Sequence, residues 1–202
     1  MELYIIRHGE THWNSKNLLQ GRADIELNEN GRELAGITGQ NLHHLSFDKI
    51  YSSPLIRAYE TACLIRGHRN IPIIRDDRLQ EISFGEYEGK NAKELFANES
   101  DPFHYFFTEP EKFQPAKGGE RFEDVCARGK DFLQNVIEPQ AAQQERIMIV
   151  AHGAMNKGLM CHILNHSIKH YWDYGLQNNC GAIVVKYENN AYQLLEENIV
   201  FY

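Results

Sequence analysis

The chain has 202 residues, of which 42% are hydrophobic and 24% charged, and its 21 Lys and Arg against 28 Asp and Glu residues give a net charge of −7. These values predict one soluble globular domain that needs neither a disulfide nor a metal to stay folded. The acidic balance argues against a nucleic-acid binder, and no apolar run approaches the ~18 residues of a membrane span. Four cysteines without ligand spacing, and no signal-like segment before the first apolar run, predict reduced thiols in a cytoplasm.

Apolar runs and amphipathic stretches alternate along the chain. The predicted strands are residues 3–6, 49–51, 71–74 and 147–151, followed by a hairpin of residues 182–187 and 192–195. The predicted helices are residues 29–45 behind an Asn28 N-cap, Ser53 to Ile65 with Pro54 at the first helical position, 122–136 and 154–164. This order predicts an α/β fold with three α/β/α layers, in which helices cover both faces of a mostly parallel central sheet.

Side chains suited to chemistry follow the predicted strands, at the carboxyl ends where parallel α/β sheets bind ligands. The groups that follow strands are Arg7-His8-Gly9, Glu81 and His152-Gly153. Arg57 lies in the helix that Ser53 is expected to open. Because a lone histidine or arginine more often has a structural or solvated role, the functional argument depends on the combination.

Together these side chains fit phosphoryl transfer. The guanidinium groups of Arg7 and Arg57 match the equatorial oxygens of a phosphoryl group, and their charge keeps a neighbouring imidazole neutral. His8 would then attack phosphorus and become a phosphohistidine, while His152 donates to a non-bridging oxygen. Glu81 would protonate the leaving alcohol and later take a proton from the attacking water.

The residues also stand in motifs that resemble the histidine phosphatase superfamily, also called phosphoglycerate mutase-like, in its phosphatase branch. The resemblance covers nearly the whole chain, and within that branch the chain resembles the broad-specificity and alpha-ribazole phosphatases. The matching motifs are Arg7-His8-Gly9-Glu10-Thr11 with Trp13-Asn14, Gln20-Gly21-Arg22, Asn30-Gly31, Ser52-Ser53-Pro54-Leu55 with Arg57-Ala58 and Glu60-Thr61-Ala62, residues 81–89, and His152-Gly153.

This resemblance implies a metal-independent phosphatase of the histidine acid type, without a cofactor, that acts on a small phosphorylated metabolite. It implies His8 as the phosphorylated nucleophile, Arg7, Arg57 and His152 in the phosphate pocket, and Glu81 as the proton donor. The positions expected to bind substrate are Arg7, Asn14, Gln20, Gly21, Arg57 and Gly153. We expect no nucleic-acid or membrane partner, and the sequence leaves the oligomeric state open, a homodimer included.

We expect one histidine phosphatase domain over residues 1–202, in which residues 86–120 form a helical, aromatic insertion that caps the active site. The segment from 96 to 120 is irregular and crowds five aromatic residues among three prolines. It is either a lid over the site or a small helical unit whose aromatic residues pack onto the main core.

Three alternatives compete with a phosphatase. A phosphoglycerate mutase would grip a substrate carboxylate with arginines after the acid glutamate, but here residues 85–89 are followed by acidic and aromatic residues. A catalytically silent phosphate-binding domain is disfavoured, because every catalytic candidate is present. A metal site on His162, His166 and His170 has helical spacing but no further ligand. Arg121, where the phosphatases usually have a small hydroxyl residue, is expected to point outward.

Overall fold

The computed structural model describes residues 1–202. The protein has a six-stranded mixed central sheet with the strand order β3-β2-β4-β1-β5-β6. The strands are β1 (Glu2–Arg7), β2 (Lys49–Ser52), β3 (Ile73–Arg75), β4 (Arg146–Ala151), β5 (Ala182–Glu188) and β6 (Ala191–Ile199). The first four are parallel to one another, and β5 and β6 form an antiparallel hairpin whose strand β5 pairs with β1. A mostly parallel sheet is therefore confirmed.

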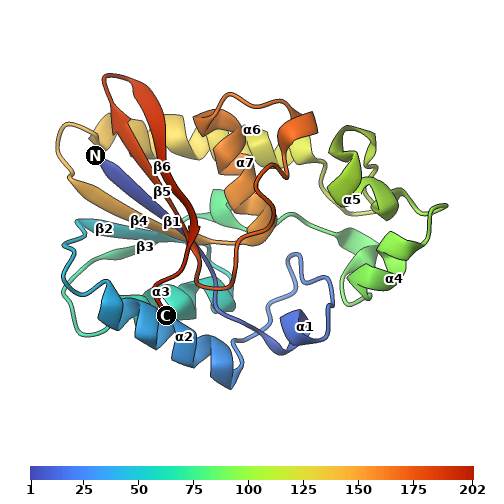
Figure 1. The fold of residues 1–202 in the computed structure, drawn as a ribbon, viewed down its shortest axis with the longest axis horizontal. Helices are drawn as coiled ribbons and strands as arrows, with labels where there is room; N and C mark the ends of the chain where they lie inside the picture. The colour runs from blue at the N-terminus through green and yellow to red at the C-terminus, as the bar shows by residue number, and fades with distance from the viewer.

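Two pairs of helices cover the two faces of the sheet (Figure 1). They are α2 (Glu29–Asn41) with α3 (Ile56–Arg66), and α6 (Phe122–Phe132) with α7 (Gly153–Ile163). Successive side chains of a strand point to opposite faces of the sheet, so β1 packs against both helical layers. Leu3 and Ile5 are buried with residues of α6 and α7, whereas Ile6 is buried with Ala35 of α2 and Ala58 of α3. Both faces are thus apolar, as the continuous apolar run predicts.

The remaining helices are short. They are α1 (His12–Ser15), α4 (Ala92–Ala97) and α5 (Tyr105–Thr108), and a π-helical turn (Leu133–Ile137) continues α6. In Figure 1, α1, α4 and α5 lie on the side of the molecule toward which the parallel strands run. The aromatic residues of this region pack in chains; the rings of Phe103 and Phe106 are stacked with centroids 4.9 Å apart. Both rings belong to the main core, so aromatic residues of the segment 96–120 pack onto it.

Three predicted boundaries are wrong. α3 begins at Ile56 behind Leu55, not at Pro54, because the Ser53 hydroxyl contacts a distant histidine and Ser53 is not the helix N-cap. β3 begins at Ile73, after Pro72, whose nitrogen has no hydrogen to donate to a ladder. α2 ends at Asn41, and the four residues after it form a turn.

Candidate active site

Strand register brings the two histidines together. Arg7 at the end of β1 is paired with Ala151 at the end of β4, so His8 and His152 each come one residue beyond their strand. The backbone N–H of His8 donates to the carbonyl of Ala151 at 3.0 Å, and the two imidazole centroids are 5.2 Å apart. The carboxyl-end rule therefore placed both side chains correctly at one site.

The His8 ring is held as a neutral imidazole with one free nitrogen. Its Nδ1 lies 2.7 Å from the carbonyl oxygen of Gly9. A carbonyl can only accept, so Nδ1 carries the proton and Nε2 keeps its lone pair. Burial, with added repulsion from Arg57 and Arg7, lowers the pKa of His8 well below its ordinary value of 6.5. At neutral pH the ring has the form that a nucleophile requires.

The loop that carries His8 is fixed from three directions. The N–H of Gly9 donates to the Thr61 hydroxyl at 2.9 Å, and this hydroxyl donates to the Arg57 carbonyl at 2.6 Å. The amide of Asn179 donates to the His8 carbonyl at 3.0 Å. A Cβ on Gly9 would lie 2.6 Å from the carbonyl oxygen of Gly31, so only glycine fits between this loop and α2.

The two arginines are buried and only partly paired. Arg57 Nη1 donates to the carbonyl of Ala23 at 2.9 Å, and Nη2 donates to that of Gly21 at 2.7 Å. Arg7 Nη1 donates to the carbonyl of Gln177 at 2.6 Å. Burial lowers the pKa of Arg57 to about 10, so the guanidinium stays charged at neutral pH. These anchors leave the buried Nε of each arginine without a protein partner.

His152 is fully buried, and its ring lies beside that of His8. Its Nε2 lies 2.8 Å from the hydroxyl of Ser53, and its Nδ1 is buried without a partner. Burial, and then the charge of Arg57, lowers the pKa of His152 well below the ordinary value. Nδ1 of His152 and Nε of Arg7 and Arg57 are thus three unsatisfied buried nitrogens around His8. Such groups require an explanation, and a bound anion provides one.

Glu81 lies between β3 and α4 in the sequence, and its side chain contacts the first turn of α7. Its Oε1 accepts from the N–H of Met155 at 2.9 Å and of Ile82 at 3.0 Å, and its Oε2 accepts from Ala154 at 3.3 Å. The side chain also borders the cavity that contains His8. The carboxyl group is therefore held in one orientation within reach of a bound ester.

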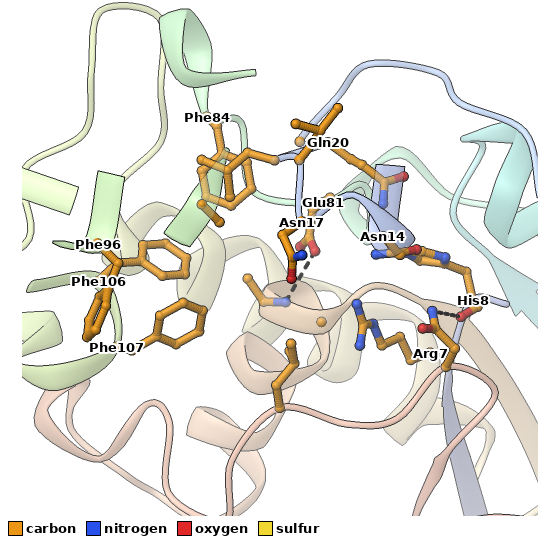
Figure 2. A pocket seen from close by; sticks show the side chains of 18 of the residues that line it. Arg7, His8, Asn14, Asn17, Gln20, Glu81, Phe84, Phe96, Phe106 and Phe107 are labelled. Carbon is orange, nitrogen blue, oxygen red and sulfur yellow. Dashed lines mark hydrogen bonds between the residues drawn. The ribbon is translucent and has the colours of Figure 1, made fainter. Parts of the chain in front are cut away.

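The cavity has a volume of about 460 Å³ and two chemically different ends. At one end lie the two arginines and the nucleophile candidate, and four amide side chains also line the cavity. The other end is apolar and is formed by Leu18, Leu19, Phe84, Phe96, Phe106, Phe107 and Trp172, whereas Leu176 borders the cavity beside Gly153. Figure 2 shows the four phenylalanine rings gathered across the cavity from Arg7 and His8. The indole of Trp172 donates to the Phe106 carbonyl at 2.6 Å, and this bond links the two parts of the cavity wall that Trp172 and Phe106 form.

The predicted substrate-binding residues also border this cavity, namely Arg7, Asn14, Gln20, Gly21, Arg57 and Gly153. Asn14 Oδ1 accepts from the N–H of Thr11 at 3.1 Å, which leaves the amide nitrogen available to a ligand. Gly21 has φ +52°, a left-handed conformation that favours glycine. Arg121 lies outside the cavity, exposed and paired with Asp124 at 2.9 Å, in the outward orientation expected.

Sequence reasoning missed several residues of the site. Gln177 and Asn179 hold Arg7 and His8 from the loop before β5. β5 runs antiparallel to β1 and begins beside the end of β1. The loop before β5 therefore lies at the edge of the sheet where the parallel strands end. A search of the residues that follow each strand does not include this loop. Asn17 and Lys93, which also line the cavity, carried no local signal either.

The three histidines of the alternative metal site, His162, His166 and His170, do not line this cavity. His162 Nε2 contacts Glu138 at 3.1 Å, and His170 Nδ1 contacts Asp173 at 3.0 Å. No group of three His, Cys, Asp or Glu residues is arranged to hold a metal ion. None of the helices combines the length and the apolar character needed to cross a membrane.

Comparison with known proteins matches the whole domain. The sequence model of the histidine phosphatase superfamily (branch 1) matches residues 3–200. Phosphoserine phosphatase 1 of Hydrogenobacter thermophilus is 31% identical over 98% of this chain and 92% of its own. A 2,3-bisphosphoglycerate-dependent phosphoglycerate mutase of Cytophaga hutchinsonii is 34% identical over 80% of this chain and 76% of its own. The solved structure of Bacillus stearothermophilus YhfR has 34% identity and a TM-score of 0.90, covering 98% and 97% of the chains.

Proposed function

The chain belongs to the histidine phosphatase superfamily and hydrolyses phosphomonoesters through a phosphohistidine, and we propose that His8 is the residue phosphorylated. The observation that carries this assignment is the set of three unpartnered buried nitrogens around its neutral ring. They would bind the oxygens of a phosphoryl group while Nε2 attacks the phosphorus. The expectation of a phosphatase of this family is confirmed.

In the first step we assign the attack to His8 Nε2. The Nε2–P bond forms as the bond from phosphorus to the ester oxygen breaks, and Glu81 gives its proton to the departing oxygen. Arg7, Arg57 and His152 stabilise the charge on the equatorial oxygens. In the second step water attacks phosphorus and gives a proton to Glu81, the Nε2–P bond breaks, and inorganic phosphate leaves.

The apolar end of the cavity would receive the alcohol part of the substrate, and residues 86–120 would act as its cap. This segment contributes Phe96, Phe106 and Phe107 to the cavity wall, and Lys93 as its cation. We therefore propose a small phosphorylated metabolite whose alcohol part presents an apolar or flat surface. A mutase has to hold a second acidic group, and beyond the two arginines the cavity offers only Lys93.

We propose that the partner of this site is a small phosphomonoester rather than nucleic acid or a membrane, and the residues that line the cavity belong to this chain. We place the enzyme in the cytoplasm because its four cysteines are free thiols, and two of them are buried.

The test is to replace the nucleophile. His8→Ala should abolish turnover of p-nitrophenyl phosphate, whereas His44→Ala, an exposed histidine, should leave it unchanged. Brief reaction with a ³²P-labelled ester should give wild-type protein an acid-labile, alkali-stable label that His8→Ala lacks. Folding of each variant is checked by its thermal transition. A folded His8→Ala variant that still turns over substrate, or still takes the label, would exclude His8 as the nucleophile.

A further inference from the structure

Ser53 is a buried serine between β2 and α3 that the mechanism above does not use. Its backbone N–H donates to the carbonyl of Val150 at 3.0 Å, which fixes it beside the end of β4. Its hydroxyl oxygen lies 2.8 Å from Nε2 of His152 and accepts the N–H of Leu55 at 3.3 Å. The hydroxyl therefore has one hydrogen left to donate, and the imidazole nitrogen is the acceptor in contact with it.

We propose that Ser53 is a positioning residue that sets the tautomer of His152: its hydroxyl donates to Nε2, so that Nδ1 carries the hydrogen and donates to the phosphoryl group. The opposite tautomer would leave the serine hydrogen without an acceptor. It would also turn a lone pair at Nδ1 toward the negatively charged phosphoryl group. This proposal rests on the proposed function of the same site.

The tautomer matters because His152 has a single ring hydrogen. Burial and the charge of Arg57 lower the pKa of His152, so that the ring is neutral at the pH of catalysis. A neutral imidazole donates from one nitrogen only, and its second hydrogen bond determines which one. Nδ1 is buried without a partner, so this donor is already free of competing protein contacts when phosphate arrives.

The tautomer can be measured in the wild-type protein without a variant. In protein labelled with ¹⁵N-histidine, long-range ¹H–¹⁵N correlations distinguish a protonated from an unprotonated ring nitrogen, and His152→Ala identifies the signal. We expect a protonated Nδ1 and an unprotonated Nε2, both in the free protein and with orthovanadate bound. A protonated Nε2 in the free protein would overturn the proposal, whatever the activity of any variant.

Kinetics provide the second measurement. Ser53→Ala and the nearly isosteric Ser53→Cys should lower kcat roughly 10- to 100-fold, as loss of an orienting partner does for metal-bound histidines. The loss should be equal for p-nitrophenyl phosphate and an alkyl phosphate, and orthovanadate should inhibit correspondingly less well. Ser52→Ala, which removes an equally buried hydroxyl without a histidine contact, is the control. Folded Ser53 variants with wild-type kcat would refute the proposal, whereas an active His8→Ala would refute the proposed function instead.

Discussion

Glu81 is fastened to the first turn of α7, where its Oε1 accepts the backbone N–H of Met155 at 2.9 Å. The same helix begins directly after His152, so one element fixes both the proposed proton donor and the proposed phosphate ligand. Their relative position is therefore set at the first turn of α7.

Replacing Glu81 by Gln should remove proton donation and keep the hydrogen bonds that hold the side chain in place. The Gln oxygen can still accept backbone N–H bonds, but the side chain has no acidic proton to give. We expect kcat for an alkyl phosphate to fall by roughly 10²- to 10⁴-fold. The loss on p-nitrophenyl phosphate should be much smaller, because its leaving group needs no proton. Glu86→Gln, at an exposed carboxylate nearby, is the control, and equal losses on both esters would exclude the acid function.

The apolar end of the cavity predicts a preference among esters. Phe107 lines it and is 41% exposed, so Phe107→Ala should leave the fold stable. We expect KM for an aryl phosphate such as naphthyl phosphate to rise several-fold, since burial of a ring contributes roughly 1.5–3 kcal/mol when complete. KM for 3-phosphoglycerate should change little. Leu195→Ala, at 41% exposure on the distant β6, provides the matched control, and an unchanged aryl-phosphate KM would contradict the predicted contact.

Much of the fold was predictable because the relevant signals are local. Residues 3–6 and 147–151 show apolar runs that are typical of strands covered on both faces, and both became central strands. The start of α3 was not predictable. Ser53 and Pro54 have the local pattern of a helix start, but the Ser53 hydroxyl is engaged by His152, 99 positions away in the sequence. The order of the strands likewise depends on long-range packing.

The site could be predicted as far as it follows parallel strands. Arg7, His8 and His152 were found because their strands run side by side in the same direction. Asn179 was missed because it precedes an antiparallel strand, and asparagines before a strand are read as turn residues. Sequence spacing also cannot show that the N–H of Met155 would hold Glu81, since this bond spans 74 positions.

Activity should be independent of divalent metal. The positive charges at the phosphate end come from Arg7 and Arg57, and no group of three metal-binding side chains is assembled anywhere in the chain. Dialysis against EDTA should therefore leave kcat/KM for p-nitrophenyl phosphate unchanged. A metal-dependent phosphatase treated in parallel shows that chelation was effective. If EDTA removed the activity and added Zn²⁺ or Mg²⁺ restored it, the enzyme would need a bound metal and the prediction would be wrong.

Mild acid should destabilise the protein through its two buried histidines. Burial lowers the pKa of both His8 and His152 in the folded chain, whereas unfolded histidines titrate near 6.5. Below that pH the unfolded state binds more protons than the folded state, so the free energy of unfolding falls as the pH falls. Each histidine contributes a slope of at most about 1.4 kcal/mol per pH unit.

Urea unfolding between pH 7.5 and 5.5 measures this slope. The acidic groups with lowered pKa values, such as Asp76 and Asp131, lose their contribution at lower pH, because an unfolded Asp titrates near 3.8. The window above pH 5.5 therefore isolates the histidines. His8→Ala and His152→Ala should each reduce the slope by up to one proton at the acid end of this window, whereas the exposed-site variant His44→Ala should not. Equal slopes in all three variants and the wild type would show that the two rings are not held neutral by the fold.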